Sequence, residues 1–334
     1  MRAMVLDAPR RPLRCRAMKV PTPGPGQVLI RVHACAVCRT DLHVVDGDLT
    51  EPKLPLVPGH EIVGSVATLG PGVDRFAVGD RVGVPWLGWT CGECEFCREG
   101  NENLCSRQKI TGVTVDGGYA EFVKAPATHS LKIPDGLSAL EAAPLFCAGL
   151  TVYRALKGAG IVPGQRLAVF GIGGLGHLAV QFGRAFGAEV TAIDISDEKL
   201  ELARTFGAAD ALNAATTDVV KQLRRKGGVH VSLVTSAAKA AYDTAFSCLR
   251  PAGTLLVVGL PAENICFPPI LMAAREVRIH ASTVGTRQEM REVLAMAVAG
   301  KILCRVVKRP LAEANEALDL LRKGEVSGRI VLTP

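Results

Sequence analysis

Residues 167–194 read LAVFGIGGLGHLAVQFGRAFGAEVTAID, in which an apolar run enters a glycine-rich turn, a helix-like stretch follows, and a second apolar run ends at Asp194. Gly171, Gly173 and Gly176 have the spacing G-x-G-x-x-G. Between a strand and a helix, the first glycine permits a tight bend, the second lets the backbone approach a pyrophosphate, and the third lets helix and strand pack closely. The stretch therefore predicts a doubly wound parallel α/β sheet that binds a dinucleotide.

Asp194 predicts which dinucleotide binds. The helix N-terminus after the glycines offers N–H groups and the positive end of its dipole to the pyrophosphate. A carboxylate at the end of the second strand accepts hydrogen bonds from both adenosine ribose hydroxyls. The same carboxylate repels a 2′-phosphate, and neither Ile195 nor Ser196 is an arginine that would attract one. We therefore expect NAD in preference to NADP.

A loop with four cysteines, CGECEFCREGNENLC, predicts a closed metal site. Its ligands are Cys91, Cys94, Cys97 and Cys105. Four thiolates at this spacing suit a tetrahedral structural Zn²⁺ with no open position. An iron–sulfur cluster is the alternative, but the bacterial ferredoxin run places its fourth cysteine after three residues and before proline. Here seven residues intervene and serine follows, which favours zinc.

Three other residues predict a second, catalytic metal site. Cys38 lies in ACAVCRTDLH, His60 in LVPGHEIVG and Cys147 in APLFCAGLTVYRAL. Taken singly, each is more simply explained as a structural residue, since a lone cysteine usually behaves as a small buried hydrophobe. Together, two thiolates and one imidazole leave one corner of a tetrahedral zinc open for water or substrate, which is typical of a catalytic site.

These motifs make the chain resemble the zinc-dependent alcohol dehydrogenases of the medium-chain dehydrogenase/reductase superfamily, microbial type. The resemblance runs from MRAMVLD to GRIVLTP, and GHEIVGSVATLGPGV is similar to the family's zinc signature. It implies a GroES-like β-rich catalytic domain over 1–148 and 285–334, and a Rossmann domain over 149–284, with the active site in the cleft between them. It also implies two zinc ions per chain and a homotetramer, with a homodimer as the next choice.

The resemblance also assigns roles to single residues. It places Glu61 behind the catalytic zinc as a transient ligand, Asp41 as the carboxylate that orients the histidine ligand, and Thr40 with His43 in a proton relay. Thr40 and Trp86 would line the substrate pocket. Cofactor contacts are implied for Arg39, Gly171, Gly173, Gly174, Leu175, Gly176, Asp194, Lys199, Val284 and Arg329.

The implied reaction is hydride transfer between a primary alcohol/aldehyde pair and NAD(H) through a zinc-bound alkoxide. In microbial relatives, a tryptophan at the position of Trp86 lines a narrowed pocket. This resemblance favours short primary alcohols as substrates, while aromatic aldehydes stay open because a flat ring also fits beside an indole. The simpler alternative is that Trp86 and Trp89 pack the domain core, and for Trp89 we expect that alternative.

Three other classes of protein fit the motifs less well. A zinc-free quinone or enone reductase has no use for the seven predicted metal ligands. A binding protein without activity would be expected to lose the zinc corner or the relay. A polyol or sugar dehydrogenase usually has glutamate at the position of Cys147.

Composition excludes further classes. The net charge of +7 comes from arginines and lysines spread along the chain, without an aromatic-interleaved basic face, so specific nucleic-acid binding is not expected. We expect no secretory signal and no membrane span. Clustered, metal-like cysteines indicate a reducing cytoplasm. Of the 11 cysteines, five lie outside the predicted clusters and most of them are expected to be buried: Cys15, Cys35, Cys248, Cys266 and Cys304.

The order of strand and helix patterns predicts two architectures. Short β-rich segments separated by Pro and Gly suit a barrel-like domain, and they cover 1–7, 27–34, 62–70, 81–86 and 119–125. Strands alternating with helices suit a parallel sheet, and these strands cover 165–171, 189–194, 231–237, 253–259 and 277–283. Amphipathic helices over 287–301 and 313–324 precede a last strand over 328–334.

Overall fold

The computed structural model describes residues 1–49 and 52–334, which form two compact units. Unit 1 comprises residues 1–150, 284–300 and 304–334, and unit 2 comprises residues 151–283 and 301–303. Residues 301–303 belong to unit 2, whereas the resemblance assigned them to the first domain. Two hydrogen bonds of 2.8 Å each join this segment to unit 2: Leu303 N donates to Gln181 Oε1, and Gln181 Nε2 donates to Leu303 O.

Unit 2 is built on a parallel sheet, as predicted. Among the described residues its six strands follow the order β12-β11-β10-β13-β14-β15, and every pair is parallel. The strands are β10 (Arg166–Phe170), β11 (Glu189–Asp194), β12 (Asp210–Asn213), β13 (Val229–Val234), β14 (Leu249–Val257) and β15 (Arg278–Ala281). The chain order reverses between β10 and β13, and ligands of such sheets bind beyond the carboxyl ends of the strands at that point.

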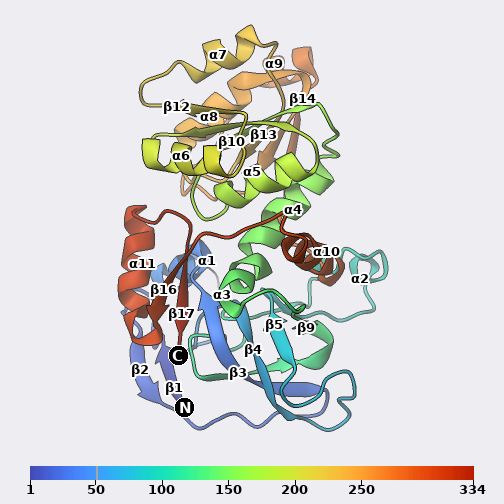
Figure 1. Cartoon of the computed structure of the whole chain (residues 1–334), viewed down its shortest axis with the longest axis vertical. Helices are drawn as coiled ribbons and strands as arrows, with labels where there is room; N and C mark the ends of the chain where they lie inside the picture. The colour runs from blue at the N-terminus through green and yellow to red at the C-terminus, as the bar shows by residue number, and fades with distance from the viewer. Residues whose placement is uncertain (50–51) are drawn as a thin grey trace. The chain divides into compact units, whose positions relative to one another are not determined.

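Helices cover both faces of this sheet (Figure 1). Helices α5 and α6 pack together over β10 and β11, while α7 and α8 pack together with α8 on β13. Their bounds are α5 (Gly176–Ala185), α6 (Asp197–Thr205), α7 (Val219–Arg225), α8 (Lys239–Cys248) and α9 (Pro269–Arg275), and α4 (Ala148–Gly158) precedes β10. The short strand β12 was not predicted, because DALN has neither a β-branched nor an aromatic residue to favour a strand.

Unit 1 is the β-rich unit that the resemblance implied. Its main sheet has the order β16-β17-β3-β4-β5-β9, with β8 also paired to β3, and two small sheets pair β1 with β2 and β6 with β7. The bounds are β1 (Arg2–Val5), β2 (Arg14–Ala17), β3 (Gln27–Ala36), β4 (Glu61–Leu69), β5 (Arg81–Val84), β6 (Leu87–Trp89), β7 (Lys109–Ile110), β8 (Phe122–Pro126), β9 (Leu131–Lys132), β16 (Val306–Pro310) and β17 (Arg329–Thr333). Strands β2, β6, β7, β9 and β16 were not predicted. RCRA and VVKRP in β2 and β16 are rich in charge and mostly exposed, and the other three strands have only two or three residues each.

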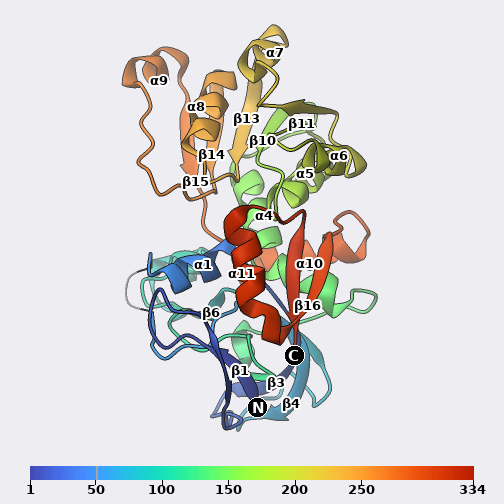
Figure 2. The same ribbon diagram turned by 90° about the vertical axis from the view of Figure 1, so that its left-hand side faces the viewer.

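The helices of unit 1 are short apart from two, both of which the periodicity predicted. They are α10 (Arg287–Val298) and α11 (Ala314–Lys323). Helix α11 buries Ala314, Ala317 and Leu318 and contacts both α1 and β16 (Figure 2). The others are α1 (Arg39–Asp46), α2 (Glu95–Arg98) and α3 (Ala139–Ala142), with single 3₁₀ turns η1 (Glu102–Leu104), η2 (Ala127–His129), η3 (Ala143–Phe146) and η4 (Leu311–Glu313).

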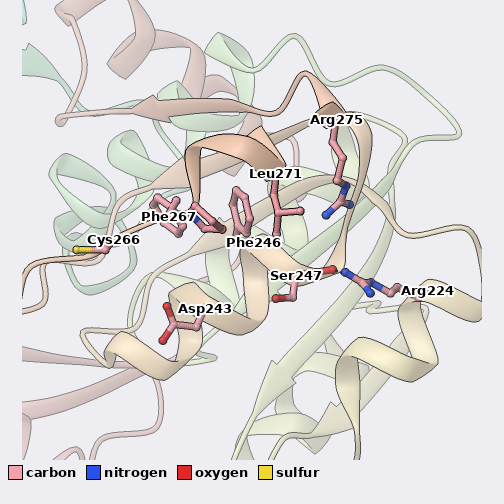
Figure 3. A pocket seen from close by; sticks show the side chains of 9 residues that line it. Arg224, Asp243, Phe246, Ser247, Cys266, Phe267, Leu271 and Arg275 are labelled. Atoms are coloured by element: carbon pink, nitrogen blue, oxygen red, sulfur yellow. Dashed lines mark hydrogen bonds between the residues drawn. The ribbon is translucent and has the colours of Figure 1, made fainter. Parts of the chain in front are cut away.

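The expectation that most of the unclustered cysteines are buried is wrong. Cys35 and Cys248 are buried, Cys304 is half-buried, and Cys15 and Cys266 are exposed. Cys15 lies on β2, whose four residues are all exposed. Cys266 lies between β14 and α9 at the side of a hollow of about 160 Å³ in unit 2, where Phe246 and Phe267 stack (Figure 3). The residues lining this hollow include none of the predicted metal or cofactor residues.

Within residues 1–49 and 52–334, no single helix has the length and apolar character needed to cross a bilayer. One bent pair of helical segments, Ala139–Phe146 with Ala148–Gly158, meets that test on length and composition alone.

The glycine turn connects β10 to α5 and shows why two of its glycines are needed. Gly171 has φ +89°, a left-handed conformation that only glycine adopts without strain. A Cβ atom at Gly176 would lie 1.9 Å from Gly171 O, so α5 could not begin so close to β10. A Cβ atom at Gly173 would meet nothing within 4 Å. The space beside Gly173 is therefore open, which is expected of a glycine whose backbone approaches a pyrophosphate.

We expect Gly176→Ala to lower the free energy of unfolding by about 1–3 kcal/mol, because the added methyl group overpacks the turn. Gly173→Ala is the matched control and should change it by less than about 0.5 kcal/mol. Denaturant unfolding of both variants without cofactor tests this. Equal losses at the two positions would contradict the packing role of Gly176.

Candidate active site and metal centres

Cys38, His60, Glu61 and Cys147 form a buried cluster in unit 1. Cys38 follows β3, His60 and Glu61 lie at the start of β4, and Cys147 lies between η3 and α4. One ligand atom from each of the four lies within 4.8 Å of the others. Cys38 Sγ and Cys147 Sγ are 3.9 Å apart. A tetrahedral zinc with Zn–S bonds of ~2.3 Å has sulfur–sulfur edges of about 3.8 Å, so the two sulfurs have the separation that zinc requires.

The imidazole of His60 is oriented as a metal ligand. Its Nδ1 lies 3.2 Å from Asp41 Oδ1, and both side chains are fully buried. Neither ring nitrogen has a hydrogen-bond partner among the described residues; Nδ1 has the carboxylate of Asp41 beside it, whereas Nε2 has no such neighbour. A buried polar atom of this kind needs a partner, and a metal between the two thiols would supply it.

Asp41 is itself held in place by two donors. Its Oδ2 accepts hydrogen bonds from Cys38 N at 2.8 Å and from the Tyr119 hydroxyl at 2.9 Å. The carboxylate therefore keeps Oδ1 toward His60, and such partners orient metal-bound histidines. Tyr119 was not identified from the sequence, since nothing in YAEFVKA indicates that this hydroxyl meets a carboxylate 78 residues away.

The thiol of Cys38 favours its metal-binding form. A hydrogen bond from Cys147 is the largest influence and lowers the pKa of Cys38, burial opposes it, and His60 and Arg329 support it. The net effect favours the thiolate, which is the form that ligates metals.

Glu61 forms a buried ion pair with Arg329 that no sequence pattern predicted. Arg329 Nη2 donates to both carboxylate oxygens at 2.6 Å, and the two residues are 0% and 3% exposed. Burial is the largest influence on Glu61 and raises its pKa to about 7, although Arg329 opposes the rise. The resemblance implied a cofactor contact for Arg329; its Nη2 is bonded to Glu61, and the cofactor contact stays a prediction.

The two relay candidates lie three residues apart on α1, and therefore on one face of that helix. Thr40 Oγ1 lies 3.7 Å from Cys38 Sγ. His43 Nδ1 lies 2.8 Å from Asp48 Oδ2, while its Nε2 is buried without a hydrogen-bond partner among the described residues. Asp48 thus fixes the ring of His43 and leaves one ring nitrogen free for a proton.

Two apolar side chains cover the cluster. Trp86 meets the His60 ring edge-on with centroids 5.0 Å apart, and it packs against Cys38, Cys147 and Val284. Val284 is 8% exposed and has φ +36°. Trp89 lies on β6, where Lys109 Nζ is 5.9 Å from its ring centre. Of the two tryptophans, Trp86 is therefore the one in contact with the ligand cluster.

The four cysteines of the loop also converge. Ligand atoms of Cys91, Cys94, Cys97 and Cys105 lie within 4.8 Å of one another. Cys91 Sγ is 3.8 Å from Cys97 Sγ and 3.6 Å from Cys105 Sγ, close to the tetrahedral zinc edge of about 3.8 Å. Backbone N–H groups of Glu93 and Cys94 lower the pKa of Cys91 to about 6. Four sulfurs fill a tetrahedral zinc, so this site fits a structural metal.

Asp194 lies beside the glycine turn in unit 2. Its Oδ2 accepts a hydrogen bond from Ile172 N at 2.6 Å, and its Oδ1 accepts from Ile195 N at 2.8 Å and Ser196 N at 3.0 Å. These bonds hold the carboxylate at the carboxyl end of β11, next to the open space at Gly173. Lys199 lies in the first turn of α6, close by in sequence.

Two protein families match this chain. The alcohol dehydrogenase GroES-like domain matches residues 24–135, and the zinc-binding dehydrogenase family matches residues 174–299. The chain is 47% identical over 334 residues to an alcohol dehydrogenase of Geobacillus stearothermophilus, with 99% of each protein covered.

Solved structures agree with these matches. The chain is similar to the alcohol dehydrogenase of the archaeon Aeropyrum pernix, with TM-score 0.94, 37% identity and 100% of each chain covered. It is also similar to acetophenone reductase of Geotrichum candidum in complex with NAD, with TM-score 0.92 and 32% identity, covering 100% of this chain and 97% of that one.

We expect Asp41→Asn to weaken zinc binding at Cys38, His60 and Cys147 by about 10- to 100-fold, since the histidine ligand loses its orienting carboxylate. Zinc retained per chain, measured against rising chelator, tests this. Asp48→Asn, two residues beyond the end of the same helix, is the matched control and should leave zinc retention unchanged. If Asp41→Asn released zinc no sooner than the control, the orienting role would be wrong.

Proposed function

The chain belongs to the family of zinc-binding, NAD-dependent alcohol dehydrogenases, and we propose that it interconverts short aliphatic or aromatic primary alcohols and their aldehydes. The main support for the proposal is the buried cluster of Cys38, His60 and Cys147, with Thr40 beside Cys38 and His43 on the same face of α1 as Thr40. Zinc at that cluster supplies Lewis-acid polarisation of an alcohol or carbonyl oxygen. The four-cysteine loop holds a second zinc, which makes two per chain.

The chain's own residues prepare this chemistry. Asp41 holds His60 in the orientation that a ligand needs. Glu61 keeps a carboxylate behind the three ligands, and Arg329 balances its charge in a site that excludes water. Breaking such a buried pair would leave an uncompensated charge, so Glu61 and Arg329 act together.

The relay residues move the proton that the alcohol must lose. Thr40 lies beside Cys38, and its Oγ1 would accept the proton of the alcohol while its own hydroxyl proton passes on toward His43. His43, one helical turn further on, takes up the proton at Nε2, and Asp48 stabilises the charged ring at Nδ1. The buried site thereby exchanges protons with solvent along one face of α1.

Asp194 and the glycine turn select NAD as the cofactor. The carboxylate of Asp194, at the end of β11, accepts hydrogen bonds from the adenosine ribose hydroxyls and repels the 2′-phosphate of NADP. Gly171, Gly173, Gly174, Leu175 and Gly176 form the pyrophosphate turn. Further contacts to the cofactor are proposed for Arg39, Lys199, Val284 and Arg329. The NAD complex of the acetophenone reductase that this chain resembles supports the choice.

Substrate size follows from Trp86 and Thr40. The indole packs against the ligand cluster, and its bulk there favours a short or flat substrate group. We assign the enzyme to the cytoplasm as a homotetramer, with a homodimer as second choice. The support is full-length similarity to microbial alcohol dehydrogenases and cysteine-rich metal sites that require reduced thiols.

Initial rates with NAD⁺ across ethanol, hexanol, benzyl alcohol and a secondary alcohol, repeated with NADP⁺, test the proposed function. We expect the highest rates for short or flat primary alcohols, with NAD⁺ strongly preferred. Asp194→Ala should reduce that preference, since the 2′-phosphate is then no longer repelled. Protein that holds two zinc ions per chain and turns over none of these alcohols would refute the proposal.

We expect His43→Ala to slow turnover by no more than about 100-fold, because water replaces a relay in part. Cys38→Ala and His60→Ala should lose nearly all activity, because water cannot replace a zinc ligand. His33→Ala is the control, since His33 is exposed and bonds Ser65, and its kcat should match the wild type. Equal losses at His43, Cys38 and His60 would contradict the relay.

A further inference from the structure

Val284 adopts a backbone conformation that its side chain disfavours. Its φ of +36° is a genuine outlier for a β-branched residue. Residues held in this way persist only where the surroundings over-determine them, and they gather at functional sites. Val284 is 8% exposed and packs against Cys38, Cys147 and Trp86. The strained residue is therefore part of the wall of the proposed catalytic site.

The residues after Val284 are held at three consecutive positions. A Cβ atom at Gly285 would lie 2.5 Å from Leu150 Cδ1, so the backbone is pressed onto that side chain. Thr286 caps α10, because its Oγ1 accepts a hydrogen bond from Glu289 N at 3.2 Å, and Thr286 N donates in return to Glu289 Oε2 at 2.8 Å. Arg287 is bonded to Glu102. The backbone that follows Val284 is therefore restrained, so the strained conformation of Val284 cannot relax by a shift of this segment.

The Glu102–Arg287 pair is the strongest of these restraints. Glu102 Oε1 accepts from Arg287 N at 2.8 Å and Nε at 2.9 Å, and Oε2 accepts from Nε at 2.9 Å and Nη2 at 2.5 Å. The side chains are 10% and 29% exposed. Burial tends to raise the pKa of Glu102, but hydrogen bonds and charge from Arg287 outweigh it and keep the pKa below its ordinary value.

Glu102 belongs to the four-cysteine loop. It begins η1, three residues before the ligand Cys105. The pair therefore joins the loop around α2 to the first residue of α10, 185 positions away, and Figure 1 shows that loop beside α10. Loops tied down by a metal are rigid anchors, so Glu102 offers Arg287 a fixed attachment point.

We propose that the Glu102–Arg287 pair is a positioning clamp, through which the four-cysteine loop holds Val284 against Cys38, Cys147 and Trp86 and so sets the shape of the substrate site. Neither residue of the pair is a catalytic residue; both act through Val284. The consequence for alcohol selectivity rests on the proposed function.

The test uses the ratio of kcat/KM for ethanol to that for benzyl alcohol, which does not depend on the fraction of folded enzyme. We expect Glu102→Gln in the zinc-loaded protein to change this ratio by at least about threefold, within the usual range for residues that act at a distance. Glu313→Gln is the matched control, since Glu313 pairs with Arg309 at the surface of the same unit. Its ratio should equal that of the wild type.

A second background tests whether Val284 transmits the effect. Glycine adopts a positive φ without strain, so Val284→Gly needs no clamp. Glu102→Gln should change the ratio little in the Val284→Gly background. An undiminished effect in that background, or an unchanged ratio in Glu102→Gln alone, would overturn the proposal and leave the pair with a stabilising role only.

A readout without turnover separates this proposal from the proposed function. Trp89→Phe leaves Trp86 as the one tryptophan of the chain. In that background, Glu102→Gln should increase acrylamide quenching of Trp86 fluorescence, and Glu313→Gln should not. Increased quenching in a protein that oxidises no alcohol would keep the clamp and refute the activity, while unchanged quenching would refute the clamp whatever the activity.

Discussion

The buried polar cluster at the start of β4 is the constraint on which unit 1 depends. His60, Glu61 and Asp41 are each 0% exposed, so water cannot satisfy them. Each therefore needs a partner from the chain: Asp41 faces His60 and Tyr119, while Glu61 is paired with Arg329. Those partners come from α1, the segment before β8, and β17. The first and last parts of the chain are consequently fixed around one site, because an unpaired buried charge costs several kcal/mol.

The numbers of ligands give the two proposed metal sites different roles. In the proposed assignment, two thiols and one imidazole leave a tetrahedral zinc incomplete. Glu61, Thr40 and Trp86 lie beside these ligands. Four thiols complete a tetrahedron and leave no position for a substrate. A metal at the four thiols would fix their loop, and the Glu102–Arg287 pair joins that loop to the segment that contains Val284, beside the proposed catalytic site.

Most of the architecture could be predicted because its signals are local. The glycine spacing after β10, the amphipathic period of α10 and α11, and the four-cysteine spacing all lie within short segments, and short-range sterics and ligand geometry determine what such segments form. Predictions failed where the local signal was weak. Strands β2 and β16 are exposed and charged, and Cys15 and Cys266 lie on exposed segments that cysteine's usual burial does not anticipate.

The sequence by itself determined the parallel sheet, the cysteines and histidine proposed as ligands of two metal sites, and the carboxylate proposed to favour NAD, because each depends mainly on local sequence patterns. Only the tertiary structure decided which distant groups meet: Tyr119 with Asp41, Arg329 with Glu61, and Glu102 with Arg287. It also decided that Val284 is strained beside the open site. The physical reason is that a buried polar group or a strained backbone is stabilised by tertiary contacts. Residues 78 to 268 positions apart make such contacts, and no local sequence pattern predicts them.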